Sequence, residues 1–264
     1  MKEKKVLKPN VLVNWGLVAR YGFAAQFDHF FEDPAWRNLL TIQEETYAGL
    51  SYEFIATFKI SFPRANGLNN PVSFYCRGQY YTVGMREFIK CLAIYDEGFV
   101  DSNEFAQLPY EFPRDVRPED AWSLLGNGRY NASVTKGSTL QDPATRLLHY
   151  VLARSTNGRG DAAGVVTASD LFQLWSMVTG TRVNVGIDAV WCLKKQCDMG
   201  HNVVYIGSWI TRILKNFGVF PSRVPRDIIG TSQPFTEMIF RRWGYDPVDT
   251  ERRAPQRRGD PPTG

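Results

Sequence analysis

The sequence contains few of the residues that most often build catalytic or metal sites. Its 264 residues include three histidines and four cysteines. Cysteines this sparse favour a reducing compartment and free thiols over a disulfide framework. There is no G-x4-GK[ST] phosphate loop, no G-x-G-x-x-G after a strand and no G-x-S-x-G nucleophile elbow. The sequence therefore predicts neither an enzyme nor a cofactor, and we identify no small-molecule substrate.

One group of potential metal ligands lies close together, but its spacing is not that of a zinc finger or knuckle. Cys192, Cys197 and His201 form a C-x4-C-x3-H pattern without a fourth ligand, whereas structural zinc sites use closed sets of four. His29 and His149 lie in expected helices without a histidine partner of the HExxH kind. We interpret the cysteines as buried thiols and predict no metal site.

Long apolar runs are also missing. No stretch approaches the roughly 18 apolar residues of a membrane span, and the amino end lacks the apolar block of a secretory signal. We therefore expect an intracellular protein, cytoplasmic or nuclear, without a membrane partner. In that setting the tripeptide Arg159-Gly160-Asp161 is not a cell-adhesion tag, and the surrounding glycines, serine and asparagine predict a loop between two helices.

The positive charge of the chain lies at its two ends. The net charge is +4, with +3 in residues 1–10, +2 in residues 251–264 and −1 between them. We predict a basic arm over residues 1–14. We also predict a disordered basic tail over residues 246–264, which is rich in Arg, Pro and Gly. RNA or DNA would bind these ends, and the candidate contacts are Lys4, Lys5, Arg252, Arg253, Arg257 and Arg258.

Most of the remaining sequence has the pattern of amphipathic helices. Typical helix starts occur at Asp33-Pro34, at Asp142-Pro143 and at Thr167 with Asp170. The helix expected after Thr167 carries apolar residues at i, i+3, i+4 and i+7 and ends at Gly180. The same spacing recurs over residues 206–217. With 44% hydrophobic residues, the chain can bury a substantial core.

Alternation with a period of two is found in one region of the N-terminal half. Residues 58–62 (FKISF) and 72–76 (VSFYC) alternate, and the loop between them contains an Asn66-Gly67 pair. We predict a β-hairpin with a long loop. A helix should follow, capped by Thr82 and carrying Met85, Phe88, Ile89 and Leu92.

Prolines and charged residues crowd residues 109–118 and indicate an internal connection. We predict a first unit over residues 15–108, with helices and the hairpin, and an all-helical second unit over residues 119–245. The expected fold class is mainly α: a helical, bundle-like domain with one small β-hairpin in its N-terminal half.

Three tryptophans raise the question of base stacking. Trp175, Trp191 and Trp209 occupy core-compatible positions in three successive expected helices. Exposed aromatic rings bind single-stranded bases by stacking, but helical spacing favours burial. We predict that all three pack in the core.

Several of these blocks together resemble a known family. Tyr47, Leu50, Glu53 and Phe54 match a Tyr-x-x-Leu-x-x-Glu-Phe block of the first-open-reading-frame proteins of Athila-type plant retrotransposons. Further similar blocks extend over roughly residues 15–220 and include Arg77-Gly78, residues 146–186, residues 206–219, and Asn184 with Gly186 as an Asn-x-Gly pair. More loosely, the hairpin and the helix after it resemble the plant mobile domain.

The resemblance implies a gag-like protein for which no catalytic residues are established. The chain also lacks an Asp-[Ser/Thr]-Gly protease signature, a reverse-transcriptase Asp-Asp motif and the C-x2-C-x4-H-x4-C knuckle of many gag proteins. We expect a non-enzymatic, retrotransposon-derived protein that acts by self-association or partner binding. The alternatives are a nucleic-acid-binding module that uses the basic ends, a domesticated host nuclear protein related to the plant mobile domain, and an enzyme without recognisable motifs.

Overall fold

The computed structural model describes residues 5–61, 68, 70–160, 164–198, 203–223 and 225–247. The chain is 48% helical and has 14% strand in small sheets. Helices therefore predominate, as expected, but the fold is mixed α/β rather than a purely helical bundle.

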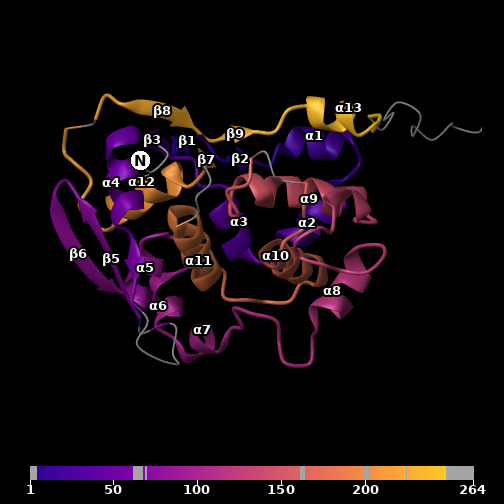
Figure 1. Cartoon of the computed structure of the whole chain (residues 1–264), viewed down its shortest axis with the longest axis horizontal. Helices are drawn as coiled ribbons and strands as arrows, with labels where there is room; N and C mark the ends of the chain where they lie inside the picture. Colours follow the sequence, from indigo (N-terminus) through magenta and orange to yellow (C-terminus); the bar gives the residue numbers. More distant parts are fainter. Residues whose placement is uncertain are drawn as a thin grey trace, which may run out of the picture.

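Helices occur along the whole described chain (Figure 1). They are α1 (Trp15–Arg20), α2 (Ala24–Phe30), α3 (Pro34–Leu40), α4 (Ala48–Thr57), α5 (Met85–Lys90), α6 (Glu97–Val100), α7 (Asn103–Gln107), α8 (Pro118–Leu125), the 3-10 helix η2 (Gly137–Thr139), α9 (Pro143–Arg154), α10 (Ala168–Thr179), α11 (Val185–Asp198), α12 (Gly207–Asn216) and α13 (Met238–Arg242). None of those in the described residues is both long and apolar enough to span a bilayer.

The predicted helix starts are confirmed. The Asp33 and Asp142 side chains accept hydrogen bonds from first-turn N–H groups of α3 and α9. Thr167 and Asp170 form a reciprocal capping box at the start of α10, which Gly180 ends in a left-handed conformation with φ 66°. The ends of these helices are thus set by residues adjacent to them in sequence.

The predicted hairpin is part of a three-stranded antiparallel sheet in the order β4-β5-β6. The strands are β4 (Lys59–Ile60), β5 (Pro71–Cys76) and β6 (Gln79–Gly84). The predicted pairing of β4 with β5 is confirmed, while the Asn66-Gly67 pair lies outside the described residues. Thr82 is not a helix cap: it lies in β6, and Gly84 precedes α5.

Three further strand pairs join the beginning of the chain to its second half. They are parallel β1 (Val6–Leu7) with β7 (Val203–Val204), parallel β2 (Val11–Leu12) with β9 (Gln233–Pro234), and antiparallel β3 (Glu45–Tyr47) with β8 (Ile228–Thr231). The prediction that residues 119–245 are all-helical is therefore wrong. Strands of two to four residues are too short to show a period in sequence.

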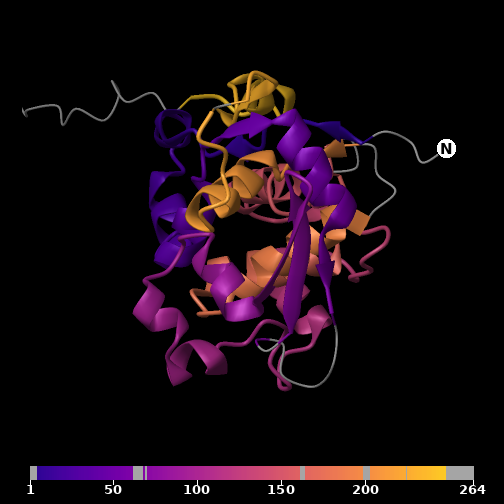
Figure 2. The ribbon, with the colours of Figure 1, turned by 90° about the vertical axis from the view of Figure 1, so that its left-hand side faces the viewer.

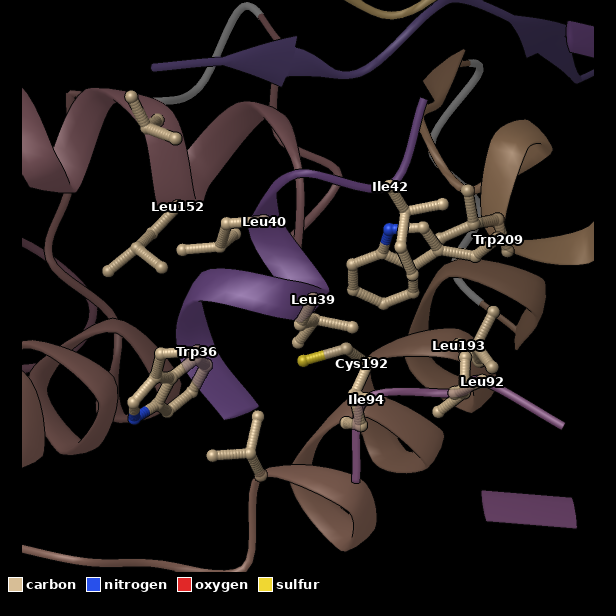
Figure 3. Close-up of a cluster of buried hydrophobic side chains, with 14 of the residues drawn as sticks. Trp36, Leu39, Leu40, Ile42, Leu92, Ile94, Leu152, Cys192, Leu193 and Trp209 are labelled. Carbon is tan, nitrogen blue, oxygen red and sulfur yellow. The ribbon is translucent and has the colours of Figure 1, made fainter. Parts of the chain in front are cut away.

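Residues from both halves pack in one hydrophobic cluster. Its centre brings α3, α11 and α12 together (Figure 3). Trp175 and Trp209 are buried, as predicted, but Trp191 is 38% exposed. The prediction for Trp191 is wrong because α11 buries its neighbours Val190 and Cys192 instead. In Figure 2 the β5–β6 end of the molecule faces the viewer.

Candidate functional site

The arginine of the Arg159-Gly160-Asp161 tripeptide is buried. Arg159 follows α9 in a turn, as predicted, yet only 6% of it is accessible. Its guanidinium pairs with the Asp170 carboxylate, and its Nη1 donates to the Val165 carbonyl oxygen at 2.7 Å. Asp161 lies outside the described residues. Arg159 and Gly160 lie outside any helix or strand, and Arg159 has a structural role.

Asp170 is the centre of a buried polar cluster. Its carboxylate accepts hydrogen bonds from the N–H and the hydroxyl of Thr167, both at 2.7 Å. Nε2 of His149 is 3.6 Å from Oδ2, too far for a hydrogen bond but within ion-pair distance. Burial would raise the pKa of Asp170, but the His149, Arg159 and Thr167 contacts outweigh it and lower the pKa to about 2. The carboxylate is therefore charged at neutral pH.

The cluster continues through α10 to α11. The Asn157 amide donates to Asp170 and to the Gln173 side-chain oxygen, both at 2.8 Å. Gln173 Nε2 in turn donates to Asp188 at 2.7 Å. Burial raises the pKa of Asp188 to about 6, although the bond from Gln173 opposes the shift. These side chains join α10, α11 and the turn after α9, which gives them a clear structural role.

The thiols do not have the environment of nucleophiles. All four cysteines are buried and free. Desolvation raises the pKa of Cys76 and Cys91 to about 11 and that of Cys197 to about 12. It also raises the pKa of Cys192 well above its ordinary value. Cys192 lies in the apolar cluster of Figure 3. Neutral, buried thiols are inert. Among the described residues there is no group of three or more potential metal ligands; His201 lies outside them.

Five of the six predicted nucleic-acid contacts lie outside the described residues: Lys4, Arg252, Arg253, Arg257 and Arg258. The sixth, Lys5, donates from Nζ to the carbonyl oxygens of Gln196 and Cys197, near the C-terminal end of α11. A cation is stabilising at that end of a helix. We therefore assign Lys5 to the fold, and binding through the other five stays a prediction.

The β5–β6 hairpin has a strained turn. Its two turn residues, Arg77 and Gly78, have φ of 56° and 73°, which is type I′ geometry. A left-handed residue other than glycine costs roughly 1–2 kcal/mol. The Glu53 carboxylate on α4 offsets this because it accepts both turn N–H groups at 2.6 Å. α4 thus supports the turn from outside the hairpin.

β6 is the outer strand of its sheet, and half of its backbone groups point away from β5. In a two-residue hairpin the residues flanking the turn are hydrogen-bonded, and bonded positions then alternate along the strand. The outward positions are Tyr80, Thr82 and Gly84. Within the described residues no further strand pairs with this edge, which lies at one end of the molecule (Figure 1).

The edge of β6 lacks the features that usually prevent strand pairing. Its sequence, QYYTVG, contains no charged residue and no proline. Tyr80 is 55% exposed and Tyr75 is 41% exposed, with ring centroids 5.1 Å apart on the outer face. On the inner face the Tyr81 ring packs against Phe74 at 5.6 Å. The core therefore fixes the strand while its edge stays accessible.

The edge of β6 is not evident from the sequence. The alternation of Tyr81 and Val83 is a strand signal, but Arg77 is not a usual left-handed turn residue, so the tight hairpin was not recognised. No protein-family model, curated protein or solved structure matches the chain.

Proposed function

We propose that the chain is a non-enzymatic, retrotransposon-derived gag-like protein that self-associates through the edge of β6. The observation that carries the proposal is the uncharged, proline-free edge with outward backbone groups at Tyr80, Thr82 and Gly84. The blocks similar to Athila-type proteins support the proposed retrotransposon origin. The proposal includes an intracellular site of action, cytoplasmic or nuclear.

A second copy of the same strand fits this edge in antiparallel orientation. With Thr82 opposite Thr82 of the second copy, the outward N–H and C=O groups of both strands pair. Tyr80 then lies opposite Gly84 of the second copy. No atom lies within 4 Å of the Cβ position of Gly84, so the glycine leaves room for the tyrosine ring, a favourable pair at strand edges. The contact is two-fold symmetric and closed.

This pairing should be weak on its own. A six-residue edge buries less than the about 1,200 Å² of a stable interface. We expect a dissociation constant of about 10 μM or weaker. Such a contact forms when copies are concentrated, as in an assembly with many subunits.

A proline at position 82 tests the proposal. The Thr82 N–H points outward, so Thr82→Pro removes an intermolecular hydrogen bond and leaves the β5 ladder intact. Thr82→Val keeps the N–H and is the matched control. Sedimentation velocity over a concentration series should show association of the native chain and of Thr82→Val, and at least about tenfold weaker association of Thr82→Pro.

Thermal melting of both variants establishes that the hairpin is intact. A native chain that stays monomeric at millimolar concentration contradicts the proposal. So does a folded Thr82→Pro variant that associates as strongly as the native chain.

A further inference from the structure

A second accessible feature is a cavity of about 280 Å³ beside η2, α9 and the end of α13. Its lining includes the cationic or titratable side chains of Lys136, Arg146 and His149 and the rings of Tyr150 and Trp243, and it includes no carboxylate. Two other cavities of the described chain are lined by carboxylates: one by Glu32 and Asp33, the other by several acidic residues within 87–97. This lining is therefore suited to an anion.

His149 forms a buried, fixed part of the wall. It is 3% exposed, and its Nε2 has no hydrogen-bond partner within the described residues. This nitrogen faces the Asp170 carboxylate, 3.6 Å from Oδ2, and so points away from the cavity. A Cβ atom at Gly137 would lie 2.8 Å from Nδ1, so the ring needs a glycine at this position. The imidazole is thus held between Asp170 and Gly137, and Nδ1 is the ring nitrogen on the side of Gly137, which lines the cavity.

Arg146 is also held in one orientation. Its Nη2 donates to the carbonyl oxygens of Ser138 at 3.1 Å and Leu140 at 2.9 Å, and its Nη1 donates to the Tyr245 hydroxyl at 3.3 Å. Nε is buried and has no partner among the described residues. The guanidinium charge is thus held at the cavity wall, where an oriented guanidinium suits a phosphate oxygen. Lys136, exposed at the rim, adds a second positive charge.

Aromatic rings form the opposite part of the lining. The Tyr150 and Trp243 rings are 6.0 Å apart and nearly perpendicular, at 84°. The Arg154 guanidinium lies 3.9 Å from the Tyr150 ring centroid and holds it by a cation–π contact. A planar base stacks on such a surface, typically for about 1–3 kcal/mol.

We propose that this cavity binds one nucleotide unit, with its phosphate at Lys136, Arg146 and His149 and its base against Tyr150 or Trp243. The volume is near the lower limit of small-molecule pockets, about 300 Å³, and so allows one unit. A free mononucleotide and a nucleotide of single-stranded RNA share this chemistry. The proposal does not depend on self-association, because β6 contributes nothing to the cavity.

Calorimetric titration of the full chain tests this site. The probes are adenosine monophosphate, adenosine, inorganic phosphate and a short oligoadenylate. Adenosine monophosphate should bind at least about tenfold more tightly than adenosine or phosphate. Lys136→Glu should weaken its binding about tenfold or more. Lys8→Glu, a charge reversal at another exposed lysine that follows β1, should leave the binding unchanged.

A second variant separates the base from the phosphate. Trp243→Leu should abolish the preference for adenosine monophosphate over phosphate, with melting curves to establish folding. If only the oligoadenylate binds, and Lys136→Glu weakens that binding, the proposal stands with RNA as the source. Phosphate binding as tight as that of the nucleotide indicates an adventitious ion only and overturns the proposal. Binding that is insensitive to Lys136→Glu, or no binding of any probe, also overturns it.

Discussion

The polar cluster around Asp170 and the edge of β6 differ in whether their hydrogen-bonding groups are buried and partnered. In the cluster, charged and amide groups are buried and partnered by side chains of α10, α11 and the turn after α9. At the edge, backbone groups of Tyr80 and Thr82 are accessible and have no strand beside them within the described chain. Polar residues thus indicate an interaction site only where the fold itself does not supply their partners. Changes in the cluster should affect stability, and changes at the edge should affect association.

The largest effect should come from removing the centre of the cluster. Asp170→Ala leaves the Arg159 guanidinium buried without its carboxylate partner. We expect the free energy of unfolding to fall by about 3–5 kcal/mol, measured by urea denaturation. The control is Asp120→Ala, which breaks the exposed pair with Arg117 and should change stability little. Equal losses in the two variants would contradict a special role for the cluster.

A smaller, pH-dependent effect is expected at Asp188. Its pKa in the folded chain, about 6, is above the ordinary value of 3.8. The folded state therefore favours the neutral carboxyl group, and this contribution to stability is lost as the pH rises from about 4 through about 6. Asp188→Asn stays neutral, so its stability relative to the native chain should increase by about 2 kcal/mol between pH 4 and pH 7.5. A difference independent of pH would refute this assignment.

The same cluster should respond in the opposite direction at lower pH. The pKa of Asp170 is lowered to about 2, so its contribution is present above about 4 and is lost as the pH falls toward 2. The free energy of unfolding of the Asp188→Asn variant, measured against pH, should therefore show the same loss between about pH 4 and pH 2 as that of the native chain.

The smallest effect should arise at the hairpin turn. Arg77→Asn places a residue that tolerates positive φ in a type I′ turn. We expect stability to rise by up to about 1 kcal/mol, while association through β6 stays the same. Chemical denaturation and sedimentation velocity measure the two quantities. A fall in stability would mean that the Arg77 side chain makes a contribution larger than the backbone strain.

The parts of the fold that depend on neighbouring residues were predictable. Asp33, Asp142 and Thr167 cap helices because each side chain reaches N–H groups two or three residues ahead. The buried faces of α9 and α10 likewise follow from helical spacing. Such patterns can be read from the sequence because all the interacting residues lie within one or two helical turns of each other.

The remainder depends on distant partners. The turn pattern around Arg159 does not predict that its guanidinium is buried against a carboxylate, because the partner, Asp170, lies on the next helix. The β1–β7 pair joins segments nearly two hundred residues apart, and no local pattern selects that partner. The cavity cannot be predicted from the sequence for the same reason, because Lys136, His149 and Trp243 come from separate segments of the chain.

The pairing of β2 with β9 has a consequence for the order in which the protein is completed. Val11 lies beside Gln233, which the ribosome adds 222 residues later. At about 5–20 residues per second, synthesis of that interval takes roughly 10–45 s. During this time β2 lacks its partner strand, so the amino-terminal segment completes this pairing only after β9 has left the ribosome.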